Sequence, residues 1–290
     1  MRLAILGLGL IGGSIARALR THTIDGPIEI AAWSPTGAGP GDAARDSTID
    51  LAAATPEAAI EGADLIVLAG PAPVCLAQLD DLAGSWNAAL APGAVITDVA
   101  STKSAIVLRA TALGLRFVGG HPMAGRETSG YAASTPDLFV GRPWVVVPTA
   151  DEAAVDRVEA LARATGAIPR RMTATAHDEA VAAVSHLPLV LAAALVESVT
   201  GEPGEPRREW SDSAALAATG WRDMTRLARG DVAMGTGIVA TNADAIASRI
   251  RDMIGVLEGW IADLERGGGP DEEALAGRLR SARERLESMP

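Results

Sequence analysis

Residues 1–20 read MRLAILGLGLIGGSIARALR, and this stretch decides the fold. The apolar run at residues 3–6 shows no polar alternation, which is typical of a strand covered on both faces. The glycine pattern Gly7-x-Gly9-x-x-Gly12 follows it, and apolar residues at helical spacing come next. In that order, the glycines let the backbone approach a pyrophosphate, and the N-terminus of the helix holds the phosphates with its N–H groups. The stretch therefore predicts a dinucleotide-binding unit, and we favour this over a glycine-rich turn that binds nothing.

Length and composition limit the class of protein. The 290 residues are 48% apolar and carry a formal net charge of −11, which disfavours binding to nucleic acid or to an anionic membrane. Charge, glycine or proline interrupts every long apolar segment, and the first strand follows directly on Met1. We therefore expect no membrane span and no signal peptide, and a cytoplasmic location. Cys75 is the only cysteine, so we interpret it as a buried thiol and expect no disulfide and no metal site.

Strand and helix patterns alternate up to residue 172. This alternation predicts an α/β fold with a Rossmann-type, doubly wound parallel sheet. Residues 37–48 are rich in glycine, alanine and proline, so we expect a surface loop there. Strands after the first are expected at residues 28–33, 64–69, 94–98, 115–118, 144–147 and 168–172.

Helices take over from residue 173. We expect a helix over residues 176–199 that Pro188 bends or breaks, a polar loop at 201–208, and one long amphipathic helix within 230–266. Together these segments have more apolar face than a small core can cover, which favours a homodimer over a monomeric bundle. The predicted domains are a Rossmann domain, residues 1–172, and an all-α substrate and dimerisation domain, residues 173–290.

Three polar residues follow predicted strands at the edge where open parallel sheets bind ligands. Ser101 and Lys103 come after the strand at 94–98, and His121 comes after the strand at 115–118. A histidine there suits a proton acceptor for an alcohol that is being oxidised, and we favour this role over a strand-capping one. Lys103 is the only lysine among 25 basic residues, which makes it a candidate for a role that a guanidinium cannot fill, with chance as the alternative.

The remaining histidines and two arginines have weaker signals. We interpret His22 as a solvated loop residue and His177 as structural, and His186 by itself is typical of a core histidine. Arg222 and Arg226 are four residues apart, so on one helix face they would suit a ligand with one or two carboxylates. A solvated helix face explains the same spacing equally well.

The choice between NAD and NADP stays open. Ser34 stands where an aspartate or glutamate would bind the ribose 2′-hydroxyl and repel a 2′-phosphate, and no arginine follows closely to attract that phosphate. The residues expected to bind the cofactor are Gly7, Gly9, Leu10, Ile11, Gly12, Ser34, Ala69, Pro71, Ser101 and Lys103.

Five motifs occur together in a fixed order. They are Gly7-x-Gly9-x-x-Gly12-Gly13-Ser14, Asp98-x-x-Ser101-x-Lys103, Gly120-His121-Pro122-Met123-Ala124-Gly125-x-Glu127, Ser185-His186-Leu187-Pro188 and Gly220-Trp221-Arg222-Asp223-x-Thr225-Arg226. In this combination the chain resembles the prephenate and arogenate dehydrogenases of tyrosine biosynthesis. The motifs lie between residue 1 and residue 230, and the remaining residues match only in being helical.

The resemblance implies oxidative decarboxylation of prephenate to 4-hydroxyphenylpyruvate with hydride transfer to NAD(P), or, as the alternative, conversion of arogenate directly to tyrosine. It implies that His121 accepts the proton of the ring C4 hydroxyl while CO₂ leaves, and that Ser101 holds this hydroxyl. It also implies that Arg226 pairs with a substrate carboxylate. Arg222 stands at a position that is often basic in the family, and Glu127 would help gate or polarise the pocket. The substrate-binding residues implied are Arg226, Arg222, Glu127, Met123, Gly125 and His186.

Leu189 departs from the family pattern, because many prephenate-using members carry a second histidine there, and this leaves the substrate open. A two-domain 3-hydroxy acid or imine dehydrogenase is a more distant alternative, but such enzymes usually rely on a lysine in the second domain. A non-enzymatic NAD(P) sensor is another, and it gives His121 and the two arginines no reason to converge. We expect no regulatory domain after residue 290 and no mutase domain before Met1, so feedback by tyrosine would act at the active site.

Overall fold

The computed structural model describes residues 1–22, 26–126, 128–202, 205–267 and 269–289. The chain forms two compact units, Met1–Ala243 and Asp244–Pro290. The boundary expected between residues 172 and 173 lies inside the first unit, where the last strand of a sheet is followed by a helix.

In the described part of the chain, six parallel strands form the main sheet in the order β3-β2-β1-β4-β5-β6. β1 lies in the middle, with Leu3 opposite Ile30 of β2 on one side and opposite Leu65 of β4 on the other. This order is that of a Rossmann fold, so the predicted doubly wound sheet is confirmed. The strands are β1 (Arg2–Leu6), β2 (Glu29–Trp33), β3 (Leu51–Ala52), β4 (Leu65–Leu68), β5 (Val95–Asp98) and β6 (Phe117–Val118).

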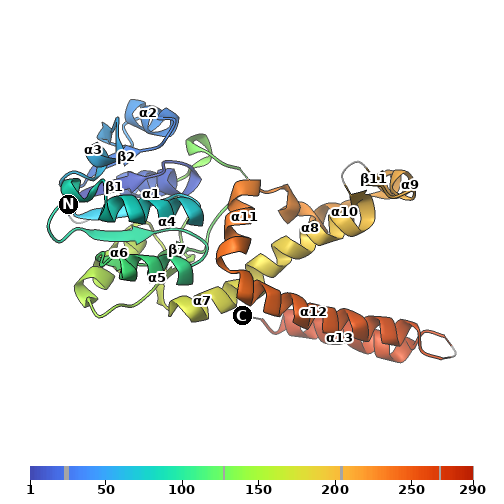
Figure 1. Cartoon of the computed structure of the whole chain (residues 1–290). Coiled ribbons are helices and arrows are strands. Elements are labelled where there is room, and N and C mark those ends of the chain that lie inside the picture. Colours follow the sequence, from blue (N-terminus) through green and yellow to red (C-terminus); the bar gives the residue numbers. More distant parts are fainter. Residues whose placement is uncertain (23–25, 127, 203–204, 268, 290) are drawn as a thin grey trace. The chain divides into compact units, whose positions relative to one another are not determined.

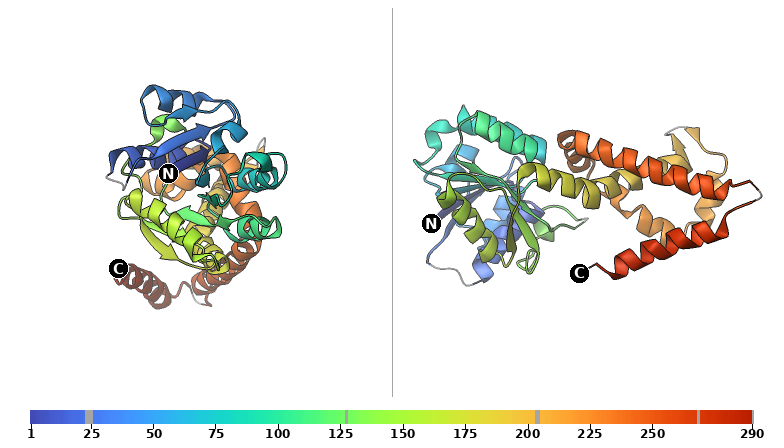
Figure 2. Two further views of the ribbon diagram at one scale, coloured as in Figure 1. Left: turned by 90° about the vertical axis from the view of Figure 1, so that its left-hand side faces the viewer. Right: turned by 90° about the horizontal axis from the view of Figure 1, so that it is seen from below.

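Helices cover both faces of the main sheet (Figure 1 and Figure 2). Side chains of β1 alternate between two cores, since Leu3 and Ile5 belong to one cluster and Ala4 and Leu6 to the other. This burial on both faces explains why the strand has no polar alternation. The first core is covered by α1 (Leu10–Thr21), α2 (Ala38–Arg45) and α6 (Glu152–Ala164), and the second by α3 (Pro56–Ile60), α4 (Ala72–Ala83) and α5 (Ser104–Ala112).

Helix α2 corrects the expectation of a loop over residues 37–48. Gly37 adopts a left-handed conformation with φ of 68° and starts the helix, and Ala43 is fully buried in the core. Gly39 is required because a Cβ there would lie 2.4 Å from the carbonyl oxygen of Leu8. The small residues that suggested a loop therefore permit close packing of a helix.

A second sheet carries His121. It contains β7 (Gly120–Pro122), β8 (Pro143–Val146) and β9 (Ile168–Arg171), with β7 antiparallel and β9 parallel to β8. The segment after β6 thus leaves the main sheet, whereas the sequence suggested that it continues to the edge of that sheet. The two sheets nevertheless meet, because the amide of Gly120 donates to Asp98 Oδ1 at the end of β5 (3.0 Å).

The helical part of the first unit begins with a continuous rod (Figure 1). It consists of α7 (Ala174–Val181), a π-helical turn (Ala182–His186) and α8 (Leu187–Thr200). Pro188 was expected to bend or break this helix. It lies instead in the first turn of α8, directly after the π-helical turn, where the missing N–H of a proline is tolerated. By length and composition the rod, residues 174–200, could cross a membrane, which differs from the expectation of no such segment. The rod contains His177, Asp178 and His186. These three residues are buried, and their side chains form hydrogen bonds within the first unit.

Further elements differ from the predicted loop and long helix. Residues 201–208, expected as a loop, include two short antiparallel strands, β10 (Gly201–Glu202) and β11 (Glu205–Pro206). The expected helix within 230–266 is broken at Asn242 into α11 (Val232–Thr241) and α12 (Ala243–Leu264). Between β11 and α11 lie α9 (Trp210–Leu216), α10 (Thr219–Met224) and a 3₁₀ turn, η4 (Arg226–Arg229). Shorter 3₁₀ turns occur at Asn87–Ala89 (η1) and Tyr131–Ala133 (η2).

The second unit pairs α12 with α13 (Glu272–Glu287). Asp263 is buried and accepts a hydrogen bond from Arg278 Nε at 2.5 Å, which joins the two helices. The guanidinium of Arg278 also lies 5.5 Å from the ring centre of Trp260. Several large apolar side chains of α12 stay about half exposed: Ile254, Leu257, Ile261 and Leu264.

Candidate active site

The glycine turn after β1 has the geometry of a phosphate-binding loop. Gly7 has φ of 109°, and a Cβ there would lie 2.8 Å from the carbonyl oxygen of Ala69. A Cβ at Gly12 would lie 2.2 Å from the carbonyl oxygen of Gly7, so both positions require glycine. No described atom lies within 4 Å of a Cβ built at Gly9, which leaves this side of the turn open in front of the N-terminus of α1. The turn and the adjoining end of β4 bring together Gly7, Gly9, Leu10, Ile11, Gly12, Ala69 and Pro71.

Ser34 directly follows β2 and supports this turn. Its hydroxyl oxygen accepts a hydrogen bond from the amide of Leu8 at 2.8 Å. The side chain therefore faces the glycine turn, and its known contact is with the protein backbone.

Lys103 lies in the interior, with its side chain fully buried. Its ammonium group forms an ion pair with Asp98 and donates to the carbonyl oxygen of Gly120 at 2.6 Å. Asp98 also accepts hydrogen bonds from the amides of Ala100 and Gly120, both at 3.0 Å. This cluster ties the turn that carries Ser101 to the strand that carries His121. Cys75, nearby, is fully buried, and burial raises the pKa of its thiol to about 12.

His121 and His177 contact each other directly. Nδ1 of His121 lies 2.8 Å from Nε2 of His177, and the two rings meet edge to face with centres 5.0 Å apart. Nδ1 of His177 in turn lies 2.8 Å from Oδ1 of Asp178. Burial, followed by the proximity of His177 and Lys103, holds the pKa of His121 well below the usual histidine range. His121 is therefore neutral at neutral pH and can accept a proton.

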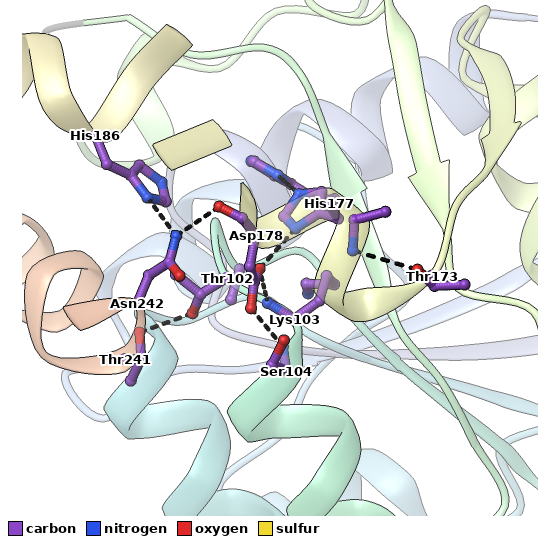
Figure 3. A network of polar contacts seen from close by, with 12 residues as sticks. Thr102, Lys103, Ser104, Thr173, His177, Asp178, His186, Thr241 and Asn242 are labelled. Atoms are coloured by element: carbon purple, nitrogen blue, oxygen red, sulfur yellow. Dashed lines mark hydrogen bonds and ion pairs between the residues drawn. The ribbon is translucent and has the colours of Figure 1, made fainter. Parts of the chain in front are cut away.

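Asp178 connects α7 to the start of α5. Its carboxylate accepts hydrogen bonds from the amides of Lys103 at 2.8 Å and of Ser104 at 2.7 Å (Figure 3). Burial alone would raise the pKa of Asp178, but hydrogen bonds from His177 and Ser104 outweigh it and lower the pKa to about 2. The carboxylate is therefore ionised, and it accepts hydrogen bonds only.

His186 belongs to the same network through Asn242. The side-chain amide of Asn242 donates to the carbonyl oxygen of Asp178 at 2.8 Å and lies 3.1 Å from Nδ1 of His186 (Figure 3). Burial lowers the pKa of His186 to about 4. Its other ring nitrogen, Nε2, is buried and has no hydrogen-bond partner among the described residues. His186 lies in the π-helical turn, a feature that is frequent at functional sites.

The two arginines lie on successive elements. Arg222 is in α10 and Arg226 begins η4, which packs against α8, and both side chains are exposed. Arg222 and Arg226 do not share one helix face as expected, because α10 ends at Met224 and the hydroxyl of Thr225 donates back to the carbonyl oxygen of Trp221. Met123 and Gly125 follow directly on β7. Glu127, expected to help gate the pocket, lies outside the described residues.

Sequence reasoning did not assign His177, Asp178 or Asn242 to the site. The available signal was the adjacent His-Asp pair, but nothing local indicates that it faces β7, 56 residues earlier. Asn242 gave no signal, because the apolar periodicity continues through it. The structure links His121 to His186 through His177, Asp178 and Asn242, and Asp178 also bonds to the amide of Lys103, two residues after Ser101.

Comparisons with known proteins agree over nearly the whole chain. Residues 15–169 match "Prephenate dehydrogenase, nucleotide-binding domain", and residues 173–275 match "Prephenate dehydrogenase, dimerization domain". The prephenate dehydrogenase of Bacillus subtilis is 31% identical over 271 residues, which are 90% of this chain and 68% of the relative.

Two solved structures are similar over 99% of this chain. The arogenate dehydrogenase of Synechocystis has a TM-score of 0.79 and 29% identity, with 100% of its chain covered. The prephenate dehydrogenase of A. aeolicus, solved with hydroxyphenyl propionate and NAD⁺, has a TM-score of 0.84 and 26% identity, with 98% of its chain covered.

Proposed function

The chain belongs to the prephenate dehydrogenase family, and from this premise we propose that it catalyses the NAD(P)-dependent oxidative decarboxylation of prephenate to 4-hydroxyphenylpyruvate. The observation that carries the proposal is the position of His121, a buried histidine with a lowered pKa that a network of polar groups holds beside the turn after β5. A neutral imidazole in this place is a general base for a hydroxyl group.

The glycine turn fits a dinucleotide. Gly7 and Gly12 allow the turn to approach β4, the open side of Gly9 leaves room for phosphates, and the first amides of α1, at Leu10 and Ile11, are available as donors. Ser34 carries no charge that would repel a 2′-phosphate, so we propose that the site takes NAD or NADP. When bound there, the cofactor supplies the nicotinamide that accepts a hydride from the substrate.

The residues of the chain supply the acid–base chemistry and the binding. We assign His121 to accept the proton of the C4 hydroxyl and Ser101 to hold the same hydroxyl. Loss of the hydride and the proton from C4, together with release of CO₂, gives an aromatic ring, which makes the reaction favourable. Arg226 pairs with a substrate carboxylate, with Arg222, Glu127, Met123, Gly125 and His186 as further substrate-binding candidates. Lys103 supports the site from the protein interior, because its ammonium group forms an ion pair with Asp98 and a hydrogen bond to the carbonyl oxygen of Gly120.

Arogenate is the second candidate substrate. Leu189 is half-buried on α8, where a second histidine would otherwise stand, and its Cδ2 lies 3.8 Å from a Cβ built at Gly235. An apolar residue in this position suits arogenate, which has an amino group in place of the keto group of prephenate. The arogenate dehydrogenase of Synechocystis also has the same fold over 99% of this chain.

We further propose the domain division 1–172 and 173–290. We also propose a homodimer formed through the helical domain, residues 173–290, and a cytoplasmic location. The match of residues 173–275 to a dimerization domain and the half-exposed apolar face of α12 support the dimer.

Formation of reduced nicotinamide tests the proposed reaction. The purified protein is given prephenate or arogenate with NAD⁺ or NADP⁺, and the absorbance of the reduced cofactor is followed. We expect turnover in at least one of the four combinations and its loss in His121→Asn. Inactivity in all four combinations, in a folded protein that binds the cofactor, would refute the assignment.

A further inference from the structure

We propose that His177 and Asp178 are positioning residues that fix the tautomer of His121, so that Nε2 of His121 is the proton-accepting atom. The pair also takes up the positive charge that His121 acquires. The role in turnover rests on the proposed function, whereas the tautomer follows from the hydrogen bonds that join His121, a neutral His177 and an ionised Asp178.

The order of donors and acceptors starts at the carboxylate. Asp178 is ionised and can only accept, so Nδ1 of His177, 2.8 Å from Oδ1, carries a hydrogen. In neutral His177 this leaves Nε2 as an acceptor. Nε2 lies 2.8 Å from Nδ1 of His121, so Nδ1 of His121 must be the donor. Neutral His121 then has its lone pair on Nε2, the ring nitrogen that faces away from His177.

The proton balance of the reaction step follows the same chain. The C4 hydroxyl gives its proton to Nε2 of His121, and the ring becomes an imidazolium with hydrogens on both nitrogens. Its Nδ1 proton can then pass to Nε2 of His177, which leaves His121 neutral and places the positive charge on His177, in contact with the Asp178 carboxylate. No proton is gained or lost within the three side chains beyond the one taken from the substrate.

Charged groups near His121 have opposite effects on its protonation. The ammonium of Lys103 lies close enough to oppose protonation of His121, but it is paired with Asp98. Asp178, in contrast, favours a positive charge on His121. Asp178 is thus a negative group that can stabilise an imidazolium, by direct contact with His177.

The same carboxylate also positions the turn that carries Ser101. It accepts hydrogen bonds from the amides of Lys103 and Ser104 at the start of α5, two and three residues after Ser101. The Asp178 side chain therefore fixes the position of the histidine pair relative to the turn that carries Ser101.

Three variants separate tautomer control from a structural role. Glutamine at 177 can accept from Nδ1 of His121 with its carbonyl oxygen and donate to Asp178 with its amide, so His177→Gln should keep kcat within about tenfold. His177→Leu should lower kcat by ~10²- to 10⁴-fold, as removal of tautomer control does in other histidine bases. In Asp178→Asn the side-chain amide can donate to His177, which exchanges donor and acceptor in each hydrogen bond up to His121. We therefore expect a similar loss of kcat.

Thr241→Val is the matched control. It removes a part-buried hydrogen bond of 2.7 Å to Thr102 in the same region and leaves the hydrogen bonds of His121, His177 and Asp178 in place, so kcat should stay unchanged. Thermal unfolding and NAD⁺ binding confirm that each variant is folded. If folded His177→Gln and His177→Leu are equally impaired, the proposal is wrong.

Nitrogen NMR on the histidine-labelled wild-type protein with NAD⁺ bound tests the tautomer directly. A variant is needed only to assign the signals. The chain has four histidines, and the His121 signals are those absent from His121→Asn. At neutral pH we expect Nδ1 of His121 protonated and Nε2 unprotonated. A hydrogen on Nε2 and none on Nδ1 would overturn the proposal. The expected pattern in a protein that turns over neither prephenate nor arogenate would leave the positioning intact and refute the proposed reaction instead.

Discussion

Replacing Lys103 with methionine is expected to destabilise the protein by more than any exposed ion pair contributes. The substitution keeps the length of the side chain but removes the ammonium group from a site where both Lys103 and Asp98 are fully buried. Asp98 would keep its hydrogen bonds from the amides of Ala100 and Gly120, but it would lose its only described cation partner. The carbonyl oxygen of Gly120 would lose a donor as well.

The magnitude follows from the burial of the pair. Removing one partner of a buried ion pair leaves an uncompensated charge and typically costs about 3–5 kcal/mol. For 290 residues the unfolding entropy is about 0.6 kcal/mol per kelvin, so the loss corresponds to a decrease in Tm of about 5–8 °C. Because Gly120 precedes His121 directly, kcat should fall as well.

Thermal unfolding followed by circular dichroism measures the effect, and two variants control it. Arg45→Met removes the cation of an exposed pair with Asp42, and exposed pairs contribute little, so Tm should change by no more than the experimental error. Asp98→Asn combined with Lys103→Met removes both charges and should be less destabilised than Lys103→Met alone. If Lys103→Met and Arg45→Met lower Tm equally, the ion pair does not hold β5 to β7 and the reasoning fails.

Four further outcomes are expected. His121→Asn should lower kcat by ~10²- to 10⁴-fold and leave NAD⁺ binding intact, and a loss below tenfold counts against a general base. The pKa of His121 is lowered and the proposed base is its neutral form, so kcat/KM should be constant through neutral pH and fall only as the pH drops below the usual histidine range; a decline that begins above pH 7 contradicts this. Arg226→Ala should raise KM by about 10- to 150-fold, the effect of losing a hydrogen bond between charged groups, and an unchanged KM moves the substrate carboxylate elsewhere. Sedimentation should show a dimer, and a monomer at micromolar concentration refutes the proposed interface.

The parts of the fold that sequence predicted are those fixed by local rules. The order strand, glycine turn, helix at residues 1–20 depends on the conformation of Gly7 and on close approach at Gly12, and both are properties of the residue itself. Helix α2 was missed for the opposite reason. Its glycines at positions 37 and 39 are signals for a loop by themselves, and only the contact with Leu8, about thirty residues earlier, makes them part of a helix.

The break at Asn242 shows the same limit in the helical part. Apolar residues recur at helical spacing on both sides, so the pattern predicts one helix through this position. The chain departs from helical geometry there, with φ of −130° and ψ of 31°, where the Asn242 amide bonds to Asp178 and His186. These partners are 64 and 56 residues away, and no local pattern contains them.

The network around Asp178 was nevertheless foreseeable in one respect. Residues 174–200 are apolar enough to be hidden inside a protein, yet they contain His177, Asp178 and His186. A buried polar group without a hydrogen bond costs about 1–3 kcal/mol, and an unpaired charge costs more, so such residues on an apolar helix are retained only when partners exist. The sequence therefore implies that the first turns of this helix face polar groups from elsewhere in the chain. Which groups these are depends on the distance between α5, β7 and α7, and only the folded structure sets that distance.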